Sequence, residues 1–143
     1  MRRAIYILAR LALAAVFLWA AIAKLRDPWM LFAIEIDNMH VIPSATVEFV
    51  ARTVPWFELV LGLMLAVGVW ARYVAPVTTV FIATLFGIVV TLYLRGFQGD
   101  CGCFGPGEQL GPKTLARDFC FVLLSAWVTW EATRGRRREW ASR

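Results

Sequence analysis

Four segments of the chain are apolar over about the length that a membrane-spanning helix needs. They cover residues 4–23, 55–71, 73–94 and 115–133, and polar positions gather between them. A helix crosses the ~30 Å hydrocarbon layer with about 20 mainly apolar residues, and only the second segment is clearly shorter. Because lipid offers no partner for unpaired backbone groups, all four segments should be helical. The pattern predicts an all-α, polytopic four-helix bundle in a membrane.

The two longer polar intervals, residues 24–54 and 95–114, lie on the same side of the predicted bundle. In the first interval apolar and charged positions alternate from Trp29 to Met39, and Pro43 divides the segment. This pattern predicts one or two amphipathic helices that lie on the bundle or at the membrane interface. The length of 143 residues, without an internal repeat, favours a single membrane domain over residues 1–143.

Composition and charge agree with a membrane protein and suggest its orientation. The chain is 60% hydrophobic and 17% charged, with a formal net charge of +5. Its basic residues lie at segment ends rather than in a stripe, which argues against a nucleic-acid partner. Nine of the fifteen Lys and Arg residues lie on the side of the termini, including the cluster 136–138. The positive-inside rule therefore predicts the cytoplasmic membrane, with both termini cytoplasmic and residues 95–114 extracytoplasmic.

The first apolar segment leaves one alternative open. Its basic start, its apolar stretch and its Ala-Ile-Ala ending at 21–23 resemble a cleavable signal peptide. Arg10 lies late for the basic region of such a peptide, and the apolar stretch is long, so we favour a retained span. The later segments have the same orientation in both cases.

Two cysteines in the second polar interval form the strongest candidate for chemistry. Cys101 and Cys103 are separated by one glycine within the glycine-rich run 99–107. Cα atoms two residues apart only just meet disulfide geometry, so a bond between these sulfurs would be strained and exchangeable rather than structural. We predict a catalytic redox pair. The alternative is a glycine-rich turn with a structural bond or two incidental thiols.

Several charged residues flank or enter the spans near the predicted outer face: Lys24, Glu58, Arg95, Arg117 and Asp118. An ionisable group within a span is costly, so it usually points into the bundle and pairs. Glu58 also precedes Gly62 by one turn, where a neighbouring helix can approach closely. We predict that Lys24, Glu58, Arg95 and Asp118 support the thiols by tuning thiolate formation. The alternative is a set of interfacial salt bridges.

Two further residues have weaker signals. Cys120 would supply a third exchanging thiol, although a small buried hydrophobe is the simpler interpretation. His40 is the only histidine, and with the three cysteines it would complete a set of four zinc or copper ligands. Because no ligand spacing surrounds His40, no metal site is predicted, and metal delivery or transport is the least favoured function.

Several motifs together resemble the MauE/DoxX group of small membrane proteins, and the MauE branch in particular. The resemblance covers nearly the whole chain, and the cysteine motif is its most specific part. The first motif is Asp-Cys-Gly-Cys-Phe-Gly at 100–105, which follows an apolar helix ending in Leu-Arg-Gly at 94–96. The second is Pro-Trp-Phe-Glu-Leu at 55–59, together with Gly62 in the same span. The others are Lys24 with Asp-Pro at 27–28 after the first span, and Arg-Asp at 117–118 in the last span.

The resemblance implies a four-helix membrane bundle that supports folding of extracytoplasmic proteins by redox chemistry. The MauE branch is associated with maturation of periplasmic methylamine dehydrogenase, whose small subunit is rich in disulfides. By this resemblance Cys101 and Cys103 inherit the redox role, Lys24, Glu58 and Asp118 inherit a supporting role, and Cys120 inherits none.

The residues and the resemblance together predict an integral membrane thiol-redox protein. If it is an enzyme, it is a thiol–disulfide oxidoreductase. Its partners would be the lipid bilayer and an extracytoplasmic client or a thioredoxin-like protein. Both a bilayer quinone and a thioredoxin-like protein fit as the electron acceptor. The alternative is a non-enzymatic assembly or scaffold subunit.

Overall fold

The computed structural model describes residues 1–100, 107 and 109–141, with side chains up to residue 134. Within these residues the regular structure consists of five α-helices and one isolated antiparallel bridge. The prediction of an all-α chain is therefore confirmed for the described residues. The helices are α1 (Arg2–Arg26), α2 (Trp29–Asn38), α3 (Ser44–Val67), α4 (Ala71–Leu94) and α5 (Pro112–Ala141).

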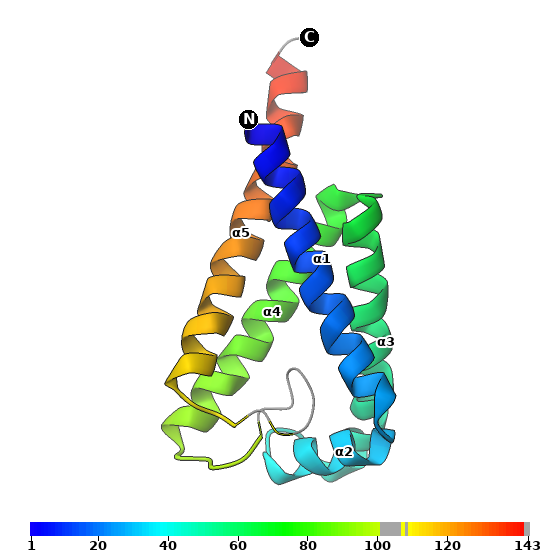
Figure 1. Cartoon of the computed structure of the whole chain (residues 1–143), viewed down its shortest axis with the longest axis vertical. Coiled ribbons are helices and arrows are strands. Elements are labelled where there is room, and N and C mark those ends of the chain that lie inside the picture. Colours follow the sequence, from blue (N-terminus) through cyan, green and yellow to red (C-terminus); the bar gives the residue numbers. More distant parts are fainter. Residues whose placement is uncertain (101–106, 108, 142–143) are drawn as a thin grey trace.

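Four long helices run along the molecule, and the short α2 lies across one end of it (Figure 1). The most extensive contacts join α1 to α3 and α4 to α5, while α2 packs on α3. The start of α1 and the end of α5 lie together at the end opposite α2. We call these the terminal end and the α2 end. The two polar intervals of the sequence therefore meet at the α2 end.

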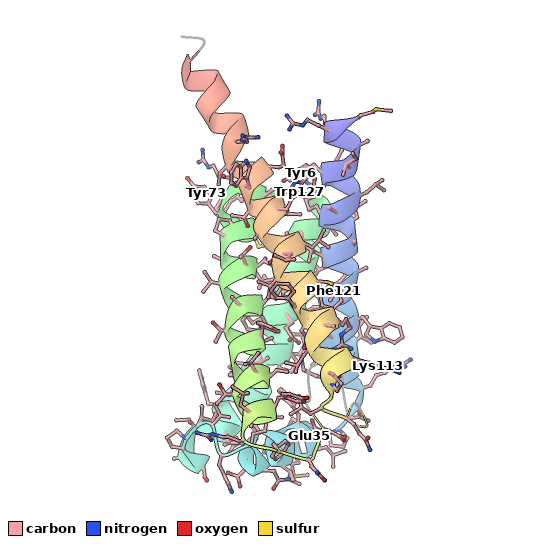
Figure 2. The ribbon with its side chains drawn as sticks, turned by 90° about the vertical axis from the view of Figure 1, so that its left-hand side faces the viewer. Tyr6, Glu35, Tyr73, Lys113, Phe121 and Trp127 are labelled. Atoms are coloured by element: carbon pink, nitrogen blue, oxygen red, sulfur yellow. The ribbon has the colours of Figure 1, made fainter. Side chains whose placement is uncertain are left out.

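Three of the described helices, α1, α3 and α4, are long and apolar enough to cross a membrane. Many of their large apolar side chains are exposed on the outside of the molecule, among them Trp19, Val67 and Val80. Such a surface suits lipid and not water. Tyr6, Tyr73 and Trp127 lie toward the terminal end, and Glu35 lies at the α2 end (Figure 2). These features support association with a lipid bilayer.

The predicted fourth span, residues 115–133, is helical, but its helix α5 is not among the three candidates within the described residues. The reason lies in its charges, because Arg117, Asp118 and Glu131 interrupt or flank its apolar stretch. The helix nevertheless packs along α4 and also contacts α1.

The helix α3 begins at Ser44, well before the predicted start of the second span at residue 55. Pro55 lies inside this helix, although proline usually occupies the first turn of a helix. Membrane helices tolerate internal proline because neighbouring groups compensate for the lost hydrogen bond. The second amphipathic helix expected after Pro43 is therefore the first part of α3. Its buried face continues without a break: Val47, Ala51, Pro55, Glu58, Leu61, Gly62 and Leu65.

The helix α1 approaches α3 closely at Gly62, as its position suggested. A Cβ atom at Gly62 would lie 3.0 Å from the side chain of Leu18. Aromatic rings extend the core toward α4, where the Phe81 ring centroid lies 6.0 Å from that of Phe17 and 5.2 Å from that of Phe57. Aromatic side chains thus join α1, α3 and α4 in the core of the molecule.

Candidate functional site

The two ends of the segment that contains the cysteine pair are held together at the α2 end. Asp100 and Gln109 form an antiparallel bridge, and the Leu110 amide donates a hydrogen bond to the Gly99 carbonyl at 3.1 Å. The Gly107 amide donates to Asp100 Oδ2 at 2.8 Å. Cys101 and Cys103 lie outside the described residues, so their redox role stays a prediction. Their flanking residues are nevertheless fixed to one another.

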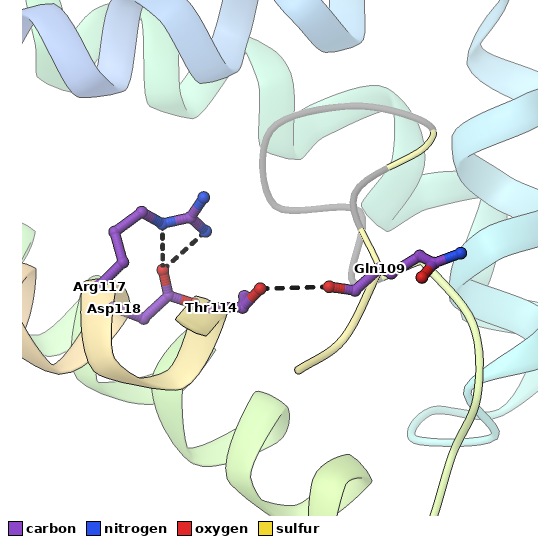
Figure 3. Close-up of polar contacts among 4 residues, drawn as sticks. All are labelled: Gln109, Thr114, Arg117 and Asp118. Atoms are coloured by element: carbon purple, nitrogen blue, oxygen red, sulfur yellow. Dashed lines mark hydrogen bonds and ion pairs between the residues drawn. The ribbon is translucent and has the colours of Figure 1, made fainter. Parts of the chain in front are cut away.

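The beginning of α5 is tied to this same segment (Figure 3). The Thr114 hydroxyl donates a hydrogen bond to the Gln109 carbonyl at 3.2 Å. One turn further along, the Arg117 guanidinium donates to Asp118 Oδ1 from Nη2 at 2.9 Å and from Nε at 3.1 Å. Thr114 and Asp118 are both buried. The bridge and the inward face of α5 therefore form one connected polar region.

Lys24 and Glu58 form an ion pair inside the molecule. Lys24 Nζ donates to both carboxylate oxygens of Glu58, at 2.7 and 2.8 Å. Both side chains are only 3% exposed, although the residues lie 34 positions apart in the sequence. A buried pair with both oxygens satisfied recovers much of the cost of removing two charges from water. The expectation that Glu58 points into the bundle and pairs is confirmed.

Two cavities meet at Glu58. The first, which we call the ion-pair cavity, has a volume of about 120 Å³ and is lined by Lys24 and Glu58 together with apolar side chains of α2, α3 and α4. The second, the core cavity, has about 50 Å³ and lies between α1, α3, α4 and α5. Its polar lining residues are Glu58 and Asp118. Two of the predicted supporting residues therefore line a common space.

Glu35 on α2 connects the cysteine segment electrostatically with the ion pair. Burial raises the pKa of the Glu35 carboxyl above its ordinary value, the charge of Asp100 raises it further, and Lys24 acts in the opposite sense. The charges of both Asp100 and Lys24 therefore act on the pKa of the Glu35 carboxyl.

Three other candidate residues do not lie in this polar region. Arg95 is exposed at the end of α4, and His40 is exposed with a positive φ of 49°. Cys120 is exposed too, so its interpretation as a buried hydrophobe is wrong. It lies two residues after the buried Asp118, and two residues turn a helix by more than half a turn. Within the described residues no group of three His, Cys, Asp or Glu side chains is placed to hold a metal ion.

Sequence reasoning did not single out Glu35 and Phe32 as site residues. Phe32 lines the ion-pair cavity, and its ring centroid lies 5.4 Å from Lys24 Nζ. The sequence did contain a pattern that indicates the inward face of this segment, because Phe32, Ile36 and Met39 recur at helical spacing. The packing of that face against an ion pair was not visible in the sequence.

Comparison with known proteins gives one match. A family model described as "Methylamine utilisation protein MauE" matches residues 2–131, which is most of the chain. No curated protein and no solved structure matches the chain. The match includes every helix of the described structure up to residue 131 and the segment with the cysteine pair.

Proposed function

The chain belongs to the MauE family of methylamine utilisation proteins, and from this premise we propose that it is a membrane thiol–disulfide oxidoreductase. It forms a four-helix bundle in the cytoplasmic membrane. Cys101 and Cys103 are its redox pair, and they act on the cysteines of an extracytoplasmic client during maturation. The client belongs to the class of secreted proteins that need disulfides, of which methylamine dehydrogenase is the one associated with this family.

The observation that supports this proposal best is the arrangement at the α2 end. The bridge between Asp100 and Gln109 keeps the ends of the cysteine segment together at this end of the molecule (Figure 1). A polar segment anchored at both ends, on one end of an apolar helical body, suits a thiol pair that must meet a soluble partner. The terminal end, by contrast, is where the sequence concentrates arginine, which favours the cytoplasm.

The proposed reaction is thiol–disulfide exchange. A client thiolate attacks one sulfur of the Cys101–Cys103 disulfide, the S–S bond breaks, and a mixed disulfide forms. The second client thiolate then attacks the mixed disulfide, so the client leaves with a new S–S bond. The pair is left as a dithiol that carries the two electrons and the two protons from the client. An oxidant must restore the disulfide, and a bilayer quinone or a thioredoxin-like partner can fill that role.

The positive charges near the segment suit the attack step. Arg95 ends α4 just before the segment, and Lys113 lies in the first turn of α5 just after it. Both side chains are exposed. Nearby cations stabilise the thiolate that leaves from the pair when the client thiolate attacks, and so favour the exchange. In this proposal Lys24, Glu58 and Asp118 hold the underlying helices in place.

The decisive experiment traps the mixed disulfide in native membranes. In the Cys103→Ser variant, the remaining Cys101 cannot close a bond within the pair, so a client should stay attached and be released by reductant. Cys120→Ser is the matched control, because Cys120 faces outward from the bundle, and it should behave like the wild type. If the pair stays in one redox state with added oxidant and no mixed disulfide forms, the protein is a scaffold instead.

A second experiment tests the proposed orientation. A membrane-impermeant maleimide should label Cys101 and Cys103 in intact cells once the outer membrane is opened. Cysteines introduced near the start of α1 should be labelled only after the inner membrane is broken. Labelling of the pair only after the inner membrane is broken would contradict an extracytoplasmic role.

A further inference from the structure

The ion-pair cavity has the size and lining of a site for a small ring. Its volume is about 120 Å³, and a dry cavity of about 150 Å³ in another protein binds benzene. Among the described residues, twelve line the cavity, and ten of these are apolar; the other two are Lys24 and Glu58. The cavity therefore combines an apolar body with one polar, charged wall.

We infer that the ion-pair cavity binds the head group of a membrane quinone. This inference rests on the proposed function, because it names the oxidant that restores the Cys101–Cys103 disulfide. A quinone head group is a flat, apolar ring with two carbonyl oxygens, and its isoprenoid tail is soluble in lipid. The α2, α3 and α4 side chains of the cavity suit the ring, and the charged wall suits the oxygens.

The charged wall is suited to both redox states of the ring. Lys24 holds a positive charge at the cavity, which attracts the partial negative charge of a quinone carbonyl. Glu58 has two carboxylate oxygens, each of which has capacity for another hydrogen bond beside the one from Lys24. A quinol hydroxyl can donate to such an oxygen. Lys24 therefore suits the carbonyl of the oxidised ring, and Glu58 suits the hydroxyl of the reduced ring.

The helix α2 links the cavity electrostatically to the cysteine segment. Phe32 and Ile36 of this helix, and Met39 directly after it, line the cavity. On the same helix, the charges of Asp100, the residue before Cys101, and of Lys24 both act on the Glu35 carboxyl. One short helix therefore supplies part of the cavity wall and carries a carboxyl that is affected by charges at both places.

The proposed step balances without another reactant. The two thiols of Cys101 and Cys103 lose two electrons and two protons, so two S–H bonds break and one S–S bond forms. The quinone gains both electrons and both protons, so two O–H bonds form and the ring becomes a quinol. The quinol then returns to the bilayer, where other membrane enzymes reoxidise it.

The test measures binding of a short-chain benzoquinone to the whole purified protein in detergent by calorimetric titration, and maps it with a photoreactive azidoquinone. We expect saturable binding and crosslinks to α2, α3 and α4 residues of the cavity. In the double variant Lys24→Met with Glu58→Leu, binding should weaken at least tenfold. Apolar replacement of a whole buried pair usually preserves the fold, so this variant should remain folded.

A matched control changes an exposed ion pair on α3, the helix that carries Glu58. Arg52 and Glu48 form an i, i+4 pair at 2.8 Å, with side chains 55% and 61% exposed. The double variant Arg52→Met with Glu48→Leu makes the same chemical change outside the cavity and should bind quinone normally. Equal binding by the two double variants, or crosslinks elsewhere on the molecule, would overturn the inference.

The remaining outcomes separate this inference from the proposed function. The variant Cys101→Ser with Cys103→Ser should still bind quinone, since the inference assigns the ring to Lys24, Glu58 and the apolar side chains of the described cavity wall. If quinone does not bind but the wild-type pair still exchanges with a thioredoxin-like protein, the inference is wrong and the proposed function stands. If an acyl chain of a phospholipid fills the cavity and excludes the ring, the inference is wrong as well.

Discussion

The helix pairs α1–α3 and α4–α5 are built on different principles. The pair α1–α3 is joined by one buried ion pair, Lys24 with Glu58, and by a close approach at Gly62. The pair α4–α5 is joined by uncharged contacts: the Thr79 and Thr129 hydroxyl oxygens lie 2.8 Å apart, and the Phe86 and Phe119 ring centroids lie 5.9 Å apart.

This difference separates a helix contact that includes a buried charged pair from one whose cited contacts are uncharged. A buried charge needs its one partner, and a glycine contact needs the absence of a side chain. A hydroxyl pair and tilted rings tolerate change, because each contributes little by itself. The α1–α3 pair is therefore the more sensitive of the two, and it is also the one that supplies Lys24 and Glu58 to the ion-pair cavity.

The largest effect should come from breaking the ion pair on one side only. Lys24→Met leaves the Glu58 carboxylate buried without its partner, and we expect a loss of about 3–5 kcal/mol in the free energy of unfolding. The double variant Lys24→Met with Glu58→Leu should recover most of that loss. Reversible unfolding in mixed micelles measures both. A double variant as unstable as the single one would contradict the interpretation.

The next effect should come from filling the space at Gly62. In Gly62→Leu the new side chain must displace Leu18 and push α1 away, so a loss of about 1–3 kcal/mol is expected. Gly87→Leu on α4 is the control, because a Cβ at Gly87 meets nothing within 4 Å. The same unfolding assay should find Gly87→Leu close to the wild type. Equal losses at both glycines would refute the proposed difference between the helix pairs.

A smaller effect is expected from the hydroxyl pair of α4 and α5. Thr79→Val removes one partner of the contact with Thr129 and should cost about 0.6 kcal/mol, the average for hydrogen bonds between membrane helices. Thr84→Val serves as the control, since the Thr84 hydroxyl donates to the Val80 carbonyl of its own helix. A loss above about 2 kcal/mol at Thr79 would mean that α4–α5 also depends on a single polar contact.

The smallest effect concerns Glu35 and depends on pH. Because the folded protein raises the pKa of Glu35, mainly through burial, this group stabilises the fold at low pH. That contribution is lost as pH rises through the raised pKa. Glu35→Gln should therefore be slightly more stable than the wild type at pH 7, by less than about 0.5 kcal/mol because solvent screens the group. The advantage should vanish near pH 4.

Thermal unfolding in detergent at pH 7 and near pH 4 would measure this difference. Asp37→Asn is the control, since Asp37 is an exposed carboxyl on the same helix. A Glu35→Gln variant that is less stable than the wild type at pH 7 would contradict the effect of burial.

The sequence predicted the membrane helices well because their signal is local. Apolar runs of sufficient length identify α1, α3 and α4, and the cost of a charge in lipid predicted that Glu58 would turn inward. A helix beginning after Pro43 was predicted, but its continuation through Pro55 into the second span was not, because proline usually occupies the first turn of a helix. The helix continues through this proline because neighbouring groups pack around it. Such packing depends on residues far apart in the chain, so a local sequence pattern does not predict it.

The partners within the site could not be predicted for the same reason. Lys24 and Glu58 are 34 residues apart, and their pairing depends on how α1 packs against α3. Neither the bridge between Asp100 and Gln109 nor the effect of the Asp100 charge on Glu35 leaves a spacing pattern in the sequence. The cysteine motif, by contrast, was recognisable at once, because its two thiols are nearly adjacent in the chain.

The Glu58 carboxylate forms part of the wall of both cavities, one against α2 and the other in the core. A molecule that enters one cavity and turns this carboxylate toward itself changes the shape and charge of the other. Such coupling is reciprocal, since occupancy of each space must change the affinity of the other by the same factor. Through one side chain, a ligand in the ion-pair cavity would thus be coupled to a ligand in the core cavity.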